Sequence, residues 1–306
     1  MIDFTNCRII PGRVYNGANG SKIAVEYNGE AYMLKFPPSG EGKPTELSYT
    51  NSCISEHLAS SIYNMIGIKA QETMLGTFTV KGKTKTVCAC KDFTVDGKRL
   101  FDFCSIKNTV IDSDTGGNGT ELEDIMDTIE KQQFVSPTRL REHFWNMFIV
   151  DTLLGNFDRH NGNWGFLYDD KTGITEIAPI FDCGSCLLPQ ADENVMREVL
   201  TDDKEMNSRV FNFPTSAIKL GGRKINYYDF LTRTDDADCI AALKRIVPKI
   251  NMDEIQSFID STEGISDLQK EFYKRYIETR YNLIIQPAIQ IAAAEEQEEN
   301  GPSMTM

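Results

Sequence analysis

Residues 153–187 read LLGNFDRHNGNWGFLYDDKTGITEIAPIFDCGSCL, and two short polar clusters interrupt the apolar residues of this stretch. The first cluster contains Asp158, His160 and Asn163, and the second begins at Asp182, directly after the apolar run APIF. Reactive side chains are commonly carried on short loops that rigid elements hold in place. We therefore expect the two clusters to form the site around which the rest of the chain is arranged.

The spacing within the clusters is that of phosphoryl-transfer enzymes. Asp158 and Asn163 repeat the Asp-x-x-x-x-Asn spacing of a kinase catalytic loop, and Asp182-Cys183-Gly184 repeats the Asp-x-Gly of a metal-binding loop. One carboxylate must position the attacking hydroxyl and accept its proton, while amide and carboxylate oxygens must hold Mg²⁺. The pattern predicts a phosphotransferase.

His160 is a candidate catalytic residue together with Asp158 and Asn163 of the same cluster. Two roles stay open for His160. One is proton transfer. The other is a hydrogen bond that fixes the shape of the loop, which we favour because a His beside an Asp often has this structural role.

Composition limits the class of protein. A chain of 306 residues exceeds the usual size of a single core, which favours two lobes. No apolar run approaches the ~20 residues of a membrane helix, and the first ten residues lack the pattern of a secretory signal. We therefore expect a cytoplasmic protein, with secretion by a signal-less route still compatible. The net charge of −13 disfavours broad binding to nucleic-acid phosphates.

The eight cysteines are scattered along the chain, as is typical of free thiols in a reducing compartment. Cys183 and Cys186 form a C-x-x-C, a spacing that also serves redox chemistry or half of a zinc site. There is no second C-x-x-C, and the three His residues are far apart in the sequence. We therefore disfavour both of these roles.

The first 36 residues predict strands around a Gly-rich turn. Asn28-Gly29 is a strong hairpin signal. A Gly-rich turn between strands lets backbone N–H groups approach phosphate, although most such turns have no ligand. We take four residues of this turn as candidate nucleotide-binding residues: Gly17, Gly20, Ser21 and Lys22.

Lys35 ends the returning strand and resembles the strand lysine of kinases that contacts the α- and β-phosphates. Residues 46–66 have helical periodicity, and Gly67 is the expected C-cap. Glu56 lies in the middle of this helix and is our preferred partner for Lys35. Glu46, near the helix start, is the alternative.

Two strands, at 73–80 and 84–90, precede Lys91, where the chain leaves the sheet. We expect the segment from Lys91 to Phe93 to contact adenine through its backbone and to mark the lobe boundary. Ser136-Pro137 is a clean helix start, and this helix should run to about Leu154, immediately before the first polar cluster.

The remainder of the chain predicts mainly short helices and one strong amphipathic helix from Ser266 to Gln286. The fold class is thus α+β, a two-lobed protein-kinase-like fold with a small β-rich lobe at 1–92 and a larger, mainly helical lobe at 93–291. Residues 292–306 are low in apolar content and are expected to form a disordered tail.

The string LLGNFDRHNGNWGFL, followed by APIFDCGSCL, resembles the HipA-like serine/threonine kinases. The resemblance implies a kinase that uses ATP and Mg²⁺. It implies Asp158 as catalytic base, Asn163 and Asp182 as metal ligands, and Lys35 as the phosphate-binding lysine. Ser21 occupies a place comparable to that of a regulatory Ser that some members phosphorylate.

One departure limits what the resemblance implies. HipA toxins carry an additional N-terminal subdomain, whereas the kinase core here begins almost at Met1, as in the shorter CtkA-type members. A protein substrate is implied, but an antitoxin partner, a DNA-bound complex and a specific target are not. We expect no direct nucleic-acid partner and no membrane partner.

Two alternative functions remain. A small-molecule or lipid kinase is one, because the Asp-Arg-His-x-x-Asn string also resembles phosphoinositide kinases; the absence of an obvious membrane-binding basic face argues mildly against it. A nucleotide-binding regulator without turnover is the other, and the presence of every expected catalytic residue type disfavours it.

Overall fold

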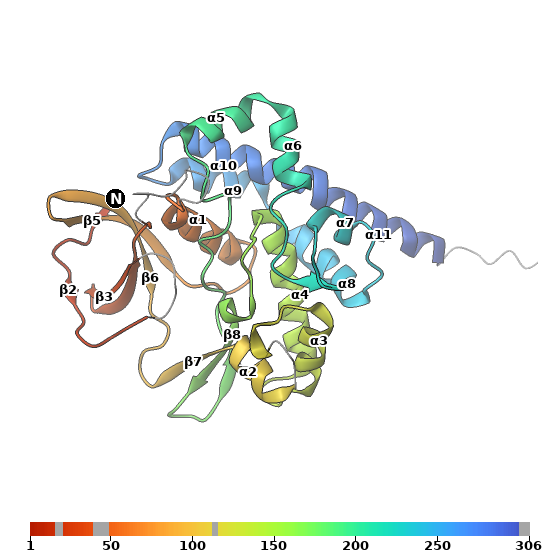
Figure 1. Cartoon of the computed structure of the whole chain (residues 1–306), viewed down its shortest axis with the longest axis horizontal. Coiled ribbons are helices and arrows are strands. Elements are labelled where there is room, and N and C mark those ends of the chain that lie inside the picture. Colours follow the sequence, from red (N-terminus) through yellow and green to blue (C-terminus); the bar gives the residue numbers. More distant parts are fainter. Residues whose placement is uncertain (16–20, 39–48, 112–115, 300–306) are drawn as a thin grey trace, which may run out of the picture.

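The computed structural model describes residues 1–15, 21–38, 49–111 and 116–299. A β-rich lobe lies on one side and a larger helical lobe on the other (Figure 1). The predicted α+β, two-lobed, kinase-like architecture is therefore confirmed. We keep the end of residue 92 as the proposed boundary between the lobes.

The β-rich lobe is built on a six-stranded sheet. All neighbouring strands are antiparallel except β1 and β5, which are parallel. Because Lys22 faces Lys35 across β3 and β4, the sheet holds two lysines side by side. The order across the sheet is β1 (Ile2–Asp3), β5 (Thr73–Val80), β6 (Lys83–Lys91), β4 (Glu30–Lys35), β3 (Lys22–Tyr27) and β2 (Arg8–Ile9).

The turn between β3 and β4 follows from its sequence. Asn28 has φ 52° and Gly29 has φ 80°, the left-handed conformations that a two-residue turn of type I′ requires. The predicted Asn28-Gly29 hairpin is confirmed.

Helix α1 (Ser52–Met65) begins later than the predicted residue 46. Asn51 explains this start, because its N–H donates to the Pro189 carbonyl at 3.1 Å and its side chain donates to the Ala191 carbonyl at 2.7 Å. These bonds attach the start of α1 to the larger lobe. Residues 39–48, which include Glu46, lie outside the described residues. The expected Gly67 is present after the helix with φ 85°.

The hydrophobic core of the larger lobe includes α1. Ile54, Leu58 and Ile62 of α1 belong to the same buried cluster as Phe148 and Leu153 of α4 (Pro137–Leu154). A separate, smaller cluster lies within the sheet. Helix α1 is thus held between the sheet and α4 (Figure 1), so a side chain from α1 can reach both lobes.

Helices make up most of the larger lobe. Helix α4 runs from Pro137 to Leu154 and ends on Gly155 in the left-handed conformation, as predicted. The other helices are α2 (Phe103–Val110), α3 (Leu122–Lys131), α5 (Glu193–Thr201), α6 (Asp203–Phe211), α7 (Tyr227–Leu231), α8 (Ala237–Ile246), α9 (Met252–Ser261), α10 (Asp267–Arg280) and α11 (Gln286–Glu299).

A three-stranded sheet supports the loop that follows α4. Strand β8 (Gly165–Asp169) lies between β7 (Lys98–Asp102) and β9 (Thr175–Ile177). A Cβ on Gly165 would lie 2.2 Å from the Phe101 carbonyl oxygen, so glycine is required where β8 meets β7. The first polar cluster is therefore held between a buried helix and a paired strand.

The C-terminal helices differ in part from the prediction. Ser266 caps α10 through a capping box with Gln269, as the capping signal predicts. Of the tail expected to be disordered, residues 292–299 instead continue α11, and residues 300–306 lie outside the described residues. Ala292 of α11 is buried, which gives this polar segment an apolar contact. Within the described residues, none of the helices is long and apolar enough to span a membrane.

Candidate active site

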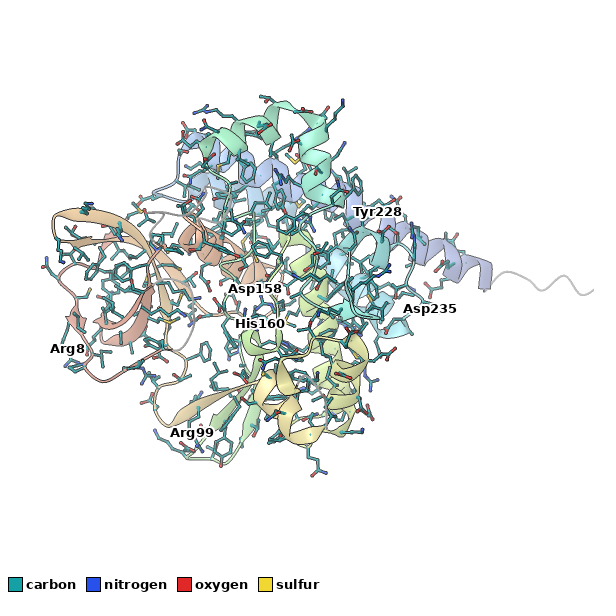
Figure 2. All side chains as sticks on the ribbon, in the orientation of Figure 1. Arg8, Arg99, Asp158, His160, Tyr228 and Asp235 are labelled. Carbon is teal, nitrogen blue, oxygen red and sulfur yellow. The ribbon has the colours of Figure 1, made fainter. Side chains whose placement is uncertain are left out.

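A cleft with a volume of about 1130 Å³ lies between the lobes. Figure 2 shows Asp158 and His160 near the middle of the molecule, where the β-rich and helical lobes meet. Both polar clusters predicted from the sequence line this cleft, together with the predicted lysine and glutamate of the smaller lobe. The predicted residues that line it are Lys22, Lys35, Glu56, Asp158, His160, Asn163 and Asp182.

Lys35 connects the two lobes at the centre of the cleft. Its Nζ lies 2.8 Å from Glu56 Oε2 and 2.8 Å from Asp182 Oδ1. Burial opposes the charged ammonium, but the two carboxylates outweigh it and raise the pKa of Lys35 well above its ordinary value. Lys35 is therefore a fixed positive charge.

Glu56 contacts more than its lysine. It is 1% exposed, and its Oε1 accepts a hydrogen bond from the Cys183 N–H at 3.1 Å. The predicted contact between Lys35 and Glu56 is present, and the same carboxylate also holds the loop of the second cluster. Helix α1 thereby positions Lys35 and the residue after Asp182 together.

Asp182 has an unusual backbone. Its φ is 56°, a left-handed conformation that is uncommon for a residue with a side chain and that is concentrated at functional sites. The positive charge of Lys35 lowers the pKa of Asp182 to about 2, against the opposing effect of burial. Its side chain is 44% exposed, so an ionised carboxylate faces the cleft.

Asp158 and Asn163 lie in one loop, joined by a hydrogen bond from Asn163 Nδ2 to the Asp158 carbonyl at 2.8 Å. This bond fixes the orientation of the amide group. The Oδ1 of Asn163 accepts no hydrogen bond from any described residue. Burial raises the pKa of the Asp158 carboxyl, with a contribution from the charge of Asp182, while His160 and Arg159 act in the opposite direction. A raised pKa makes this carboxylate a better proton acceptor.

His160 bends the loop. Its Nδ1 accepts a hydrogen bond from the Gly162 N–H at 3.0 Å, while the rest of the residue is exposed. A Cβ on Gly162 would lie 2.9 Å from the His160 ring. This geometry favours the loop-shaping role of His160 over proton transfer.

A buried ion pair beneath the loop was not predicted. Arg159 is 2% exposed and Asp151, on α4, is 1% exposed. Arg159 Nε donates to Asp151 Oδ2 at 3.0 Å, and the Tyr63 hydroxyl donates to Asp151 Oδ1 at 2.7 Å. The only signal in the sequence is Asp151 itself, a carboxylate on the apolar side of a predicted buried helix, which requires a partner.

Arg159 also joins the two polar clusters. Its Nη1 donates to the Asn163 carbonyl at 2.8 Å and to the Phe181 carbonyl at 2.6 Å. One guanidinium thus bonds both the loop of Asp158 and the residue before Asp182. Because Arg has several donors in a fixed plane, this residue sets the separation of the two loops.

Of the segment expected to contact adenine, Phe93 lines the cleft and Lys91 does not. The Lys91 N–H donates to the Glu72 carbonyl at 2.8 Å, and its Nζ pairs with Glu30 at 2.8 Å. Lys91 is therefore bound outside the cleft lining. Phe93 does line the cleft, and no described residue bonds its main chain.

A second buried carboxylate, Asp92, was also missed. It accepts hydrogen bonds from Arg13 Nε and from the Tyr15 hydroxyl. Burial opposes ionisation, but these donors hold the pKa of Asp92 below its ordinary value. Because Arg13 precedes the Gly-rich turn, this contact attaches the chain before the turn to the connection between the lobes.

The Gly-rich turn is only partly described. Gly17 and Gly20 lie outside the described residues. Ser21 is exposed, and its carbonyl accepts the Phe36 N–H at 3.0 Å. Lys22 lines the cleft, where burial and the nearby charge of Lys35 lower its pKa.

The C-x-x-C cysteines are buried beneath the second cluster. Cys183 and Cys186 are both 0% exposed, and Cys183 Sγ accepts from Arg159 Nη2 at 3.4 Å. Buried thiols are typically inert, and these two pack below the loop.

The cleft offers few metal-binding side chains, and those present are of the kind that bind Mg²⁺ together with phosphate and water. Among the described residues there is no group of three His, Cys, Asp or Glu side chains that could hold a metal ion. Mg²⁺ is commonly held by one or two protein oxygens, with phosphates and water completing its shell. The ionised Asp182 and the Oδ1 of Asn163 supply such oxygens, so the residues fit this ion.

Comparisons with known proteins agree with this arrangement. A family model described as the HipA-like C-terminal domain matches residues 16–256. The serine/threonine-protein kinase CtkA of Helicobacter pylori (strain J99) is 51% identical over 291 residues, which cover 94% of this chain and 87% of that protein.

Two solved structures are similar. The crystal structure of a Helicobacter pylori proinflammatory kinase CtkA has a TM-score of 0.91 and 49% identity, covering 96% of this chain and 98% of that chain. HipA of Shewanella oneidensis MR-1, solved with HipB and operator DNA, has a TM-score of 0.56 and 14% identity, covering 93% and 70%. The second likeness shows the fold alone.

Proposed function

The chain belongs to the HipA-like C-terminal domain family, and from this premise we propose that it is a protein serine/threonine kinase that uses ATP and Mg²⁺. The observation that carries the proposal is the double contact of Lys35 with Glu56 and Asp182, which lies in the same cleft as Asp158 and Asn163. The identity of 51% with a serine/threonine-protein kinase supports the same conclusion.

In this proposal the smaller lobe binds the nucleotide. Lys22 on β3 and Lys35 on β4 face each other and supply positive charge for the triphosphate. Ser21 precedes Lys22 in the sequence, and Gly17 and Gly20 stay candidates from the sequence pattern alone. The free main chain of Phe93 is the candidate contact for the base, in place of Lys91. The cleft volume of about 1130 Å³ is sufficient for a nucleotide.

Asn163 and Asp182 are the proposed Mg²⁺ ligands. When bound, Mg²⁺ neutralises charge on the phosphate oxygens. The protein contributes a preset geometry. Lys35 already holds one oxygen of Asp182, and Arg159 bonds the main chain at Asn163 and at Phe181, the residue before Asp182. Preorganised polar groups of this kind cost little reorganisation during the reaction.

Asp158 is the proposed catalytic base. Its carboxylate would accept the proton of an acceptor Ser or Thr hydroxyl, and its raised pKa suits that task. His160 would act as a positioning residue by holding Gly162 and the loop. A small acceptor would satisfy the same chemistry, so the protein acceptor depends on the similarity to a known protein kinase.

Transfer of labelled phosphate tests the proposal. Purified protein is incubated with radiolabelled ATP, Mg²⁺ and a panel of generic proteins, with Asp158→Asn as the matched inactive variant. We expect label on Ser or Thr with the native protein and none with the variant. Nucleotide binding without transfer to any protein would contradict the proposal and favour a regulator without turnover.

A further inference from the structure

Gln71 is a buried glutamine beside the connection between the lobes. It lines the cleft and is 6% exposed. Its N–H donates to the Ile180 carbonyl at 2.8 Å, and its side-chain Nε2 donates to the Lys91 carbonyl at 2.9 Å. Gln71 is therefore attached both to the chain that leads into Asp182 and to the end of β6.

The bond to Lys91 determines which way the amide group of Gln71 points. A carbonyl oxygen can only accept a hydrogen bond, so the amide nitrogen must be the atom that faces Lys91. The Oε1 of Gln71 is then directed away from that carbonyl, and it accepts no hydrogen bond from any described residue. Because this oxygen is not enclosed by protein and Gln71 lines the cleft, it is an acceptor available to a ligand in the cleft.

Several other polar side chains near the connection between the lobes are bonded to one another. Asp92 accepts hydrogen bonds from Arg13 and Tyr15 through Oδ2 and from Thr94 through Oδ1. Arg13 Nη2 also donates to the Thr94 carbonyl at 2.9 Å. These side chains are committed to each other, which distinguishes them from Gln71.

Two aromatic rings line the cleft close to the bonds of Gln71. Phe181 follows Ile180 in the sequence, and Phe93 lies two residues after Lys91, so each ring is near a residue to which Gln71 is bonded. The two ring centroids are 6.0 Å apart. A flat and largely apolar base suits such rings, and its polar edge can then meet the amide oxygen of Gln71.

We propose that Gln71 selects adenine, because its Oε1 accepts a hydrogen bond from the 6-amino group of the base. The proposal rests on the ATP binding proposed above and adds base specificity to it. Guanine has a carbonyl oxygen at position 6, which would face Oε1 and leave two acceptors without a donor. The bond of Nε2 to Lys91 prevents the amide from turning its own donor toward that oxygen.

Competition between two nucleotides tests this hydrogen bond without any change in the protein. ADP with a fluorescent methylanthraniloyl group on its ribose is bound to the native protein with Mg²⁺, and it is displaced by ATP or by purine riboside triphosphate. These two triphosphates differ only in the 6-amino group. We expect ATP to bind about fivefold to a hundredfold more tightly, because loss of the amino group leaves a buried acceptor unpaired.

Two variants connect this preference with Gln71. Gln71→Met keeps the length of the side chain but removes the amide, and it should reduce the preference for ATP to less than about twofold. Glu72→Gln is the matched control and should keep the native preference, because the Glu72 side chain is 72% exposed and lies outside the cleft lining.

Either of two results would overturn the proposal. One is equal affinity of the native protein for the two triphosphates, and this result decides the matter even where Gln71→Met fails to fold. The other is a native preference for ATP that persists unchanged in Gln71→Met, because another acceptor would then bind the amino group.

Phosphate transfer to generic proteins separates this proposal from the kinase function. A preference for ATP that depends on Gln71, together with transfer to Ser or Thr, supports both. The same preference without transfer to any protein supports the selection of adenine and counts against the kinase function. Transfer by a native protein that binds both triphosphates equally overturns the role of Gln71 alone. Absence of nucleotide binding overturns both.

Discussion

Lys35→Met should destabilise the fold because it leaves the buried carboxylate of Glu56 without its ion-pair partner. Glu56 is 1% exposed, and Lys35 is its only ion-pair partner among the described residues. Removing one partner of a buried pair typically costs about 3–5 kcal/mol. Because the Lys35 side chain is 13% exposed at an open cleft, we expect the lower end of this range, about 3 kcal/mol.

The double variant Lys35→Met/Glu56→Gln should be more stable than Lys35→Met alone. Gln is neutral, and it keeps an oxygen that can accept the Cys183 N–H now bonded to Glu56 at 3.1 Å. We expect recovery of about 2 kcal/mol, or a shift of about 1 M in the urea midpoint for a slope of about 2 kcal/mol/M. Urea unfolding of the native protein, both single variants and the double variant gives the coupling free energy.

Additive losses of unfolding free energy in the two single variants would refute this reasoning. They would show that Lys35 and Glu56 contribute to stability independently of each other. Lys35→Met/Asp182→Asn is the matched comparison. The Asp182 side chain is 44% exposed, so water already solvates it, and its neutralisation should recover less stability than that of Glu56.

Four further outcomes are expected. Asp182→Asn should lower phosphoryl transfer by orders of magnitude with an unchanged circular dichroism spectrum, since the amide lacks the charge that Mg²⁺ requires; native turnover would contradict the assignment. Because the pKa of Asp158 is raised, the base is protonated at a higher pH than an ordinary Asp, and kcat/KM should fall as pH decreases through that raised pKa; a pH–rate profile checks this. A Cys183→Ser/Cys186→Ser variant should keep substantial activity, and metal analysis should show no zinc lost relative to the native protein. Incubation with MgATP should phosphorylate Ser21, which opposes ATP binding by like-charge repulsion; mass spectrometry with Asp158→Asn as control would count against this if only other positions carried phosphate.

Features of the fold that depend on local chemistry could be predicted from the sequence. The Asn28-Gly29 turn requires left-handed backbone at both residues, and these residue types adopt it at low cost. The ends of α4 follow from the backbone preferences of Pro137 and Gly155, and the start of α10 follows from the side chains of Ser266 and Gln269. In each case neighbours in sequence determine the conformation.

Features that depend on distant contacts could not be predicted in the same way. The start of α1 follows from bonds between Asn51 and the chain near Pro189 and Ala191. Within the predicted segment from Lys91 to Phe93, Lys91 lies outside the cleft lining because it bonds Glu72 and Glu30, whereas Phe93 lines the cleft. No periodicity within 46–66 or around residue 91 contains this information.

Arg159 shows why the spacing of the site residues alone is incomplete. The pattern Asp158–Asn163 and the later Asp182 indicate which side chains we propose for the chemistry, but not how the two loops are held apart at a fixed distance. That separation depends on the guanidinium of Arg159, which bonds the Asn163 and Phe181 carbonyls and is balanced by Asp151 on α4. A buried charge is retained only where a paired charge and several hydrogen bonds offset its desolvation, so Arg159 and Asp151 must be present together. Arg159, which lies between Asp158 and His160 in the sequence, thus holds the main chain of both loops.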